Sequence, residues 1–183
     1  MTYEAGLQRA WDSLCVLKLG NILSVRFLAD EYTIDVGRRS VISSSCNIPP
    51  KEYTAILIVH YAARKLQGMP PLAGEWATFR EFSGIEGYYQ AFKERVISPL
   101  IRKYGDNPAG LWAVSSRFPI QKAPGADAGI VVYAFEEVPV LIKVWRADED
   151  FGPDANVYFD RNITGIFCVE DIVVLAGIVA GSV

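Results

Sequence analysis

The residue best suited to metal chemistry in this 183-residue sequence is His60, the only histidine of the chain. It lies in the apolar stretch ILIVHYAAR, where an imidazole can serve as axial ligand to the iron of haem or the cobalt of a corrinoid. Arg64 follows one helical turn later, which is the spacing that lets its guanidinium meet a propionate or phosphate of the same ligand. A core histidine that is hydrogen-bonded within the protein fits the same pattern, because a single histidine has no ligand spacing to test.

A second set of candidates is acidic. Asp148, Glu149 and Asp150 are consecutive, and Asp160 follows at the end of a predicted strand. Carboxylate oxygens suit Mg²⁺ or Ca²⁺, so Asp148, Glu149 and Asp160 are candidate metal ligands. The run lacks the spacing of a calcium-binding loop, and Asp residues beside Gly-Pro are equally typical of a solvated turn between two strands.

The segment GEWATFREFSG, residues 74–84, places Glu75 and Glu81 around Arg80. Two carboxylates can act as an acid/base pair when burial or a neighbouring charge shifts a pKa, whereas a structural Arg–Glu pair needs no shift. The aromatic residues of the segment, Trp76 among them, can line a pocket for a planar cofactor, and Arg80 can supply a positive charge beside it. Their spacing favours a dense piece of core, because large rings anchor packing.

The usual enzyme motifs are absent. The sequence contains no GxSxG nucleophile elbow and no GxGxxG or GxxxxGK[ST] phosphate loop, so whether the protein is an enzyme stays open. The three cysteines are scattered without a CxxC pair, which argues against a zinc or iron–sulfur site and predicts reduced thiols in a cytoplasmic protein. The net charge of −3 argues against a nucleic-acid partner.

Hydrophobic periodicity predicts one α+β domain over residues 1–183, with helices packed against small antiparallel or mixed sheets. His60 falls on a predicted helix, and the acidic run falls in a turn between two predicted strands. The predicted helices are 3–18, one from Pro49-Pro50 to Gly68, 85–104 with a kink or division at Pro99, 107–118 and 169–180. The predicted strands are 22–28, 32–36, 40–43, 129–135, 140–145 and 156–160.

The last predicted helix, 169–180, is apolar on every side, so we expect a second copy or a protein partner to cover it. Its apolar run is too short for a bilayer, which takes about 20 residues. The N-terminus carries Glu4 and no apolar h-region, so neither a membrane span nor a signal peptide is expected.

Three segments together resemble the DUF3786 family. They carry an HY pair late in a helix, a G-E-W-x-x-F-R-E segment, and a W-x-x-D-E-x-F turn before a strand that ends in F-D. The matching positions are His60, Tyr61, Gly74, Glu75, Trp76, Phe79, Arg80, Glu81, Trp145, Asp148, Glu149, Phe151, Phe159 and Asp160. The resemblance spans nearly the whole chain.

The resemblance implies an uncharacterised family, found mainly in anaerobic bacteria and archaea and sometimes joined to a four-cysteine iron–sulfur domain. This sequence has no such segment, which argues against an electron-transfer role, and the resemblance implies only a link to corrinoid or other redox metabolism. We therefore expect a soluble binding or accessory protein of anaerobic metabolism that holds a tetrapyrrole near His60, with Arg64, Trp76 and Arg80 as further contacts. The alternatives are a metal-dependent enzyme that uses Glu75 and Glu81 or the acidic turn 148–160, and a protein-interaction module without catalysis.

Overall fold

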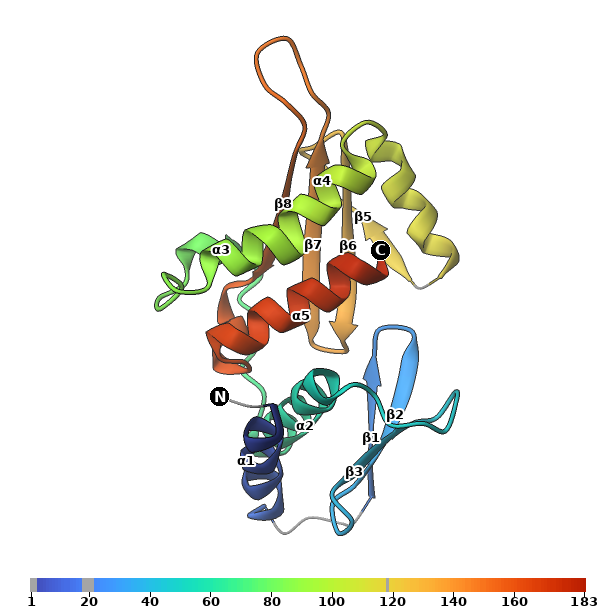
Figure 1. Cartoon of the computed structure of the whole chain (residues 1–183), viewed down its shortest axis with the longest axis vertical. Helices are drawn as coiled ribbons and strands as arrows, with labels where there is room; N and C mark the ends of the chain where they lie inside the picture. The colour runs from blue at the N-terminus through green and yellow to red at the C-terminus, as the bar shows by residue number, and fades with distance from the viewer. Residues whose placement is uncertain (1–2, 18–21, 118) are drawn as a thin grey trace. The chain divides into compact units, whose positions relative to one another are not determined.

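The computed structural model of the chain describes residues 3–17, 22–117 and 119–183 (Figure 1). The chain divides into two compact units: unit 1 comprises Met1–Pro71 and Gly165–Phe167, and unit 2 comprises Leu72–Thr164 and Cys168–Val183. Helices and antiparallel sheets occur in both, which confirms the predicted α+β class. A single domain over residues 1–183 stays a prediction.

Unit 1 is an antiparallel three-stranded meander, in the order β1-β2-β3, together with two helices that pack against each other. Its elements are α1 (Tyr3–Cys15), β1 (Ile22–Phe27), β2 (Asp30–Asp35), β3 (Ser40–Ser43) and α2 (Glu52–Gln67). Apolar side chains at helical spacing on α1, Trp11 and Leu14 among them, are buried, as the periodicity predicts. Positions 18 and 118, where two helices were predicted to end, lie outside the described residues.

The helix α2 carries His60 and is the most deeply buried helix of unit 1. Every residue from Thr54 to Val59 is buried, so the helix is held by packing on several sides. It ends at Gly68, whose φ of +106° suits a residue without a side chain. This confirms the helix predicted between Pro49-Pro50 and Gly68.

Unit 2 is built on a five-stranded antiparallel sheet with the order β4-β8-β7-β6-β5. The strands are β4 (Trp76–Thr78), β5 (Ile120–Lys122), β6 (Ala128–Phe135), β7 (Val138–Trp145) and β8 (Asp154–Asp160). The helical elements are η1 (Phe79–Glu81), α3 (Tyr89–Phe92), η2 (Lys93–Ile97), α4 (Ser98–Tyr104), η3 (Pro108–Ser116), η4 (Arg161–Gly165) and α5 (Val169–Ser182). Pro139 is the second residue of β7, at the strand start that its missing N–H requires.

One face of the five-stranded sheet forms the core of unit 2. Figure 1 shows α4 and α5 lying across this face. The neighbouring side chains of the face are at most 1% exposed; they are Ala77, Phe159, Val157, Val140, Ile142, Ile130 and Val132. The alternate positions point to the opposite face, where Trp76 is 40% and Tyr133 is 42% exposed.

Two helical predictions for unit 2 need correction in their start or helix type, whereas the predicted division near Pro99 is confirmed. The predicted helix 85–104 starts at Tyr89 and is divided by a turn of π-helix, Lys93–Ile97, just before Pro99. Proline cannot donate to the preceding turn, and the wider π turn accommodates that loss. The predicted helix 107–118 is a 3₁₀ helix, η3.

The apolar C-terminal helix is α5. It packs against α3, η2 and α4, and most of its apolar residues are buried. These contacts with α3, η2 and α4 cover part of its apolar surface. A second copy or partner on α5 stays a prediction.

Candidate functional site

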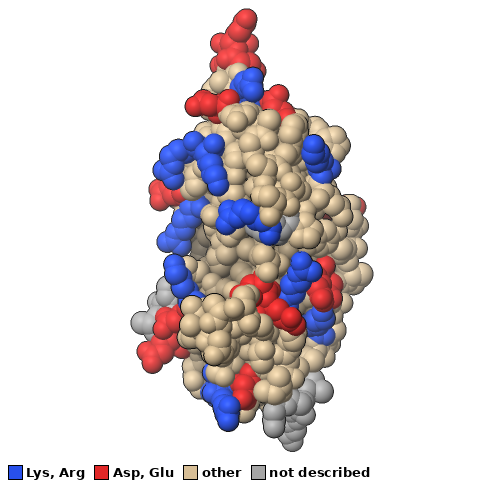
Figure 2. All heavy atoms as spheres, turned by 90° about the vertical axis from the view of Figure 1, so that its right-hand side faces the viewer, with Lys and Arg blue, Asp and Glu red and all other residues tan. Residues whose placement is uncertain are grey.

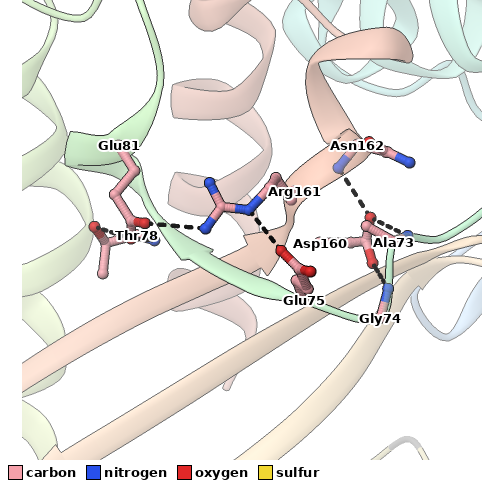
Figure 3. A network of polar contacts seen from close by, with 8 residues as sticks. All are labelled: Ala73, Gly74, Glu75, Thr78, Glu81, Asp160, Arg161 and Asn162. Atoms are coloured by element: carbon pink, nitrogen blue, oxygen red, sulfur yellow. Dashed lines mark hydrogen bonds and ion pairs between the residues drawn. The ribbon is translucent and has the colours of Figure 1, made fainter.

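Asp160, the last residue of β8, is a buried carboxylate with three hydrogen bonds to the backbone. Its side chain is almost fully buried, with 6% of the residue exposed. One carboxylate oxygen accepts backbone N–H bonds from Ala73 at 3.0 Å and Asn162 at 2.9 Å, and the other accepts the N–H of Gly74 at 2.9 Å (Figure 3). Asp160 therefore fixes the turn that leads into β4, where Gly74 has a φ of +71°.

The next residue, Arg161, joins the two glutamates of the GEWATFRE segment. Its Nε lies 3.0 Å from Glu75 Oε2 and its Nη2 lies 3.3 Å from Glu81 Oε2 (Figure 3). The Arg161 backbone N–H also donates to the Glu75 carbonyl at 2.9 Å. Both glutamates are thus held by Arg161, whereas Arg80, their predicted partner, stacks its guanidinium 4.3 Å from the centre of the Tyr89 ring.

Glu81 has a second set of contacts. Its Oε1 accepts the Thr78 backbone N–H at 2.7 Å and the Thr78 hydroxyl at 3.0 Å, which forms a capping box on η1. These two bonds, together with the charge of Arg161, lower the pKa of the Glu81 carboxyl. A carboxylate with a lowered pKa is a weaker general base, so the contacts favour a structural role for Glu81.

The aromatic residues of the same region pack on one another. The rings of Phe79 and Phe92 stack with centroids 4.3 Å apart and planes within 4°. Phe159 meets Phe92 edge-on at 6.4 Å and Phe82 at 6.2 Å, and all four rings are buried. These rings are core, as their spacing favoured; Trp76, which lies on the opposite sheet face, is half-exposed.

The acidic run forms the tip of the loop between β7 and β8. The Oδ1 of Asp148 accepts the N–H of Asp150 at 2.9 Å and that of Phe151 at 2.7 Å, while its own N–H donates to the Phe151 carbonyl. Figure 2 shows acidic side chains gathered at this protruding loop. Asp148 therefore supplies the turn chemistry that the sequence also allowed.

The structure does not bring the three predicted acidic metal ligands together. Asp148 and Glu149 precede β8 and Asp160 ends it, so the seven-residue strand, about 20 Å long, separates them. Within the described ranges, no three His, Cys, Asp or Glu side chains converge as a metal-binding group.

A second polar cluster lies in unit 1, around Asp30. The carboxylate accepts the hydroxyls of Ser43, at 2.6 Å, and Ser45, and the Cys46 thiol approaches Ser43 Oγ at 3.1 Å. Burial raises the pKa of the Asp30 carboxyl, but these hydroxyls and the backbone N–H groups of Glu31 and Ser45 outweigh it, so the pKa is lowered. The cluster links β2 to the end of β3 and to the loop after it.

His60 and Arg64 are both half-buried on α2, one helical turn apart. The buried Nε of Arg64 has no hydrogen-bond partner in the part of the chain that the structure describes. His60 takes part in an interaction within the chain. These two residues belong to unit 1, whereas Trp76 and Arg80 belong to unit 2, so the four predicted cofactor contacts are not assembled within one unit.

Sequence reasoning missed Arg161, although it named both of its partners. The sequence shows Arg161 as a cationic residue directly after the predicted strand that ends in Phe159-Asp160. That signal identifies a partner for Glu75 and Glu81 only once β4 is known to pair with β8.

Two antiparallel sheets, a core of stacked rings and a buried carboxylate that fixes a turn define an α+β protein in which Glu75, Glu81, Asp148 and Asp160 are engaged in bonds of the fold. The chain belongs to the family described as "Domain of unknown function (DUF3786)", whose sequence model matches residues 8–182. No curated protein and no solved structure matches the chain. Among the described residues, every helix is too short or too polar to cross a membrane.

Proposed function

We propose that this protein is a binding protein that holds a tetrapyrrole, haem or corrinoid, on the face of α2 that carries His60 and Arg64. The observation that carries the proposal is the buried Arg64 Nε without a hydrogen-bond partner among the described residues. A buried N–H donor without an acceptor costs free energy, and a guanidinium is suited to carboxylates and phosphates. Arg64 as a residue is half-buried while its Nε is covered, so a propionate or phosphate of a bound ligand would supply the missing acceptor once the side chain turns toward it.

His60 supports the same proposal. It is accessible in part, and it lies at the i−4 position relative to Arg64, so both side chains reach the same side of the helix. A histidine that binds a metal through one ring nitrogen ordinarily donates the N–H of its other ring nitrogen to a neighbouring group. The interaction that His60 makes within the chain is therefore compatible with metal binding. Haem or a corrinoid, when bound, would supply its own metal chemistry, while His60 would hold the metal and Arg64 an anionic group of the ligand.

The polar network of unit 2 favours binding over acid/base catalysis. Glu75, Glu81 and Asp160, the acidic residues nearest to a catalytic arrangement, are occupied by Arg161, by Thr78 and by backbone N–H groups. A cytoplasmic location and a place in anaerobic metabolism belong to the proposal as well. The last rests on the family resemblance alone.

Absorption spectroscopy tests the proposal. Purified protein is titrated with hemin and, separately, with cobalamin, and compared with His60→Ala, Arg64→Gln and the control Gln67→Ala, an exposed position on the same helix. We expect a ligand-bound Soret or corrinoid band that His60→Ala changes and Gln67→Ala leaves intact. Loss of a charged hydrogen bond in Arg64→Gln should weaken binding about tenfold. No band with wild-type protein, or a band that His60→Ala leaves unchanged, would refute the proposal.

A further inference from the structure

The outer edge of β8 is only half covered by a neighbouring strand. β4 pairs with residues 158–160 of β8, and no described strand pairs with residues 154–157 on that side. An uncovered edge exposes backbone groups that can pair with another chain, and proteins usually block such edges. The question is what occupies the backbone donors of residues 154–157.

The register of the sheet shows which donors face this edge. The Gly129 carbonyl accepts from Ala123 on the β5 side, so odd-numbered residues of β6 bond toward β5 and even-numbered ones toward β7. The same alternation makes odd-numbered residues of β7 bond toward β8, where they pair with even-numbered residues. The N–H groups of Ala155 and Val157 therefore point away from β7, toward the uncovered edge.

Both donors are occupied by the side chain of the residue before them. Asp154 Oδ1 accepts the Ala155 N–H at 2.8 Å, and Asn156 Oδ1 accepts the Val157 N–H at 2.9 Å. The two oxygens thus stand where the carbonyl groups of an incoming strand would bind.

We propose that residues 154–157 form a strand-pairing edge for a second copy of this chain and that Asp154 and Asn156 keep it closed. A second copy is the fitting occupant because an antiparallel edge is self-complementary: under a two-fold axis, the donors of each copy meet the carbonyls of the other. Asp154 adds a charge that both copies would bring to the same edge, which further disfavours pairing. These two side chains satisfy the edge N–H groups of β8, so the sheet of unit 2 needs no further strand at residues 154–157.

The test compares the wild-type chain with the double variant Asp154→Ala/Asn156→Ala. The control Asp150→Ala/Gln121→Ala removes the same charge and one amide at exposed positions elsewhere. Molar mass is measured by light scattering over a concentration series, and amide hydrogen exchange is followed at positions 155 and 157. Circular dichroism verifies that each variant is folded.

We expect the double variant to double its molar mass at concentrations where wild type and control do not. At low concentration its amides at 155 and 157 should exchange about tenfold faster than in wild type, the loss that one hydrogen bond accounts for. At high concentration the same amides should regain protection. A folded double variant that keeps the wild-type mass, or that associates without protecting these two amides, would overturn the inference.

Discussion

Nη2 of Arg161 lies 3.3 Å from Oε2 of Glu81, and this pair joins the end of β8 to η1 across 80 residues of sequence. Thr78, the last residue of β4, donates to the other oxygen of the same carboxylate. The Glu81 side chain therefore links the end of β4 to Arg161, which follows β8. The pair is largely exposed, and exposed pairs contribute little by themselves. The effect of Glu81 on the free energy of unfolding should therefore be measured as a function of pH.

We predict that Glu81 stabilises the fold at neutral pH and not in acid. The Thr78 bonds and Arg161 lower the pKa of Glu81 in the folded protein below its ordinary value of 4.5. A group of this kind contributes its full stability above the unfolded pKa and loses it as pH falls through the folded pKa. Urea unfolding of wild type and Glu81→Gln should therefore differ at pH 7, and the difference should shrink as pH falls below 4.5.

Arg161→Met serves as the matched comparison for Glu81. It leaves both Thr78 bonds in place, and these are the larger cause of the lowered pKa, so most of the pH-dependent difference should persist in that background. A difference between wild type and Glu81→Gln that stays constant down to pH 3 would contradict the prediction.

Asp160 should matter far more than the exposed ion pairs. Asp160→Ala leaves the N–H groups of Ala73, Gly74 and Asn162 without their acceptor in a buried place. We expect the free energy of unfolding to fall by about 3 kcal/mol, as measured in urea. Asp160→Asn, which keeps the shape and one acceptor oxygen, should retain part of the stability. A loss below about 1 kcal/mol in Asp160→Ala would show that the turn does not depend on this carboxylate.

The stacked ring pair should carry packing energy in unit 2. Phe92 is 1% exposed, whereas Phe151 is 74% exposed at the loop tip, so the two phenylalanines form a matched pair of test positions. Phe92→Ala should lower the unfolding free energy by about 3–5 kcal/mol because it leaves a cavity beside Phe79 and Phe159. Phe151→Ala should change it by less than about 0.5 kcal/mol. Similar losses in both variants would contradict the assignment of Phe92 to the core.

The elements that sequence patterns predict well are those whose signals are local. The helix α2 has prolines before it and Gly68 after it, and the strands β6 and β7 are apolar runs bounded by turn residues. The apolar pattern, its length and the residues that bound it identify both kinds of element without reference to the rest of the chain. The α+β class follows from them.

The elements and contacts that could not be predicted depend on pairing between segments that are far apart in the sequence. β4 has only three residues, too few for a period, and it forms because Asp160 and Arg161 hold its approach against β8. The acidic residues Asp148 and Asp160 are close in sequence, but an intervening extended strand places them at opposite ends. Short sequence spacing therefore does not bring Asp148 and Asp160 together, whereas His60 and Arg64 keep their helical spacing on α2.

The central claim is that the His60 imidazole ligates the metal of a bound tetrapyrrole, and chemical rescue tests it most directly. The variant His60→Gly is titrated with hemin in the absence and presence of free imidazole, and the Soret band is recorded beside that of wild type. We predict that wild type shows the ligated band, that His60→Gly lacks it, and that imidazole restores it. A His60→Gly spectrum that equals wild type without imidazole, or no hemin binding by wild-type protein at all, would contradict the claim.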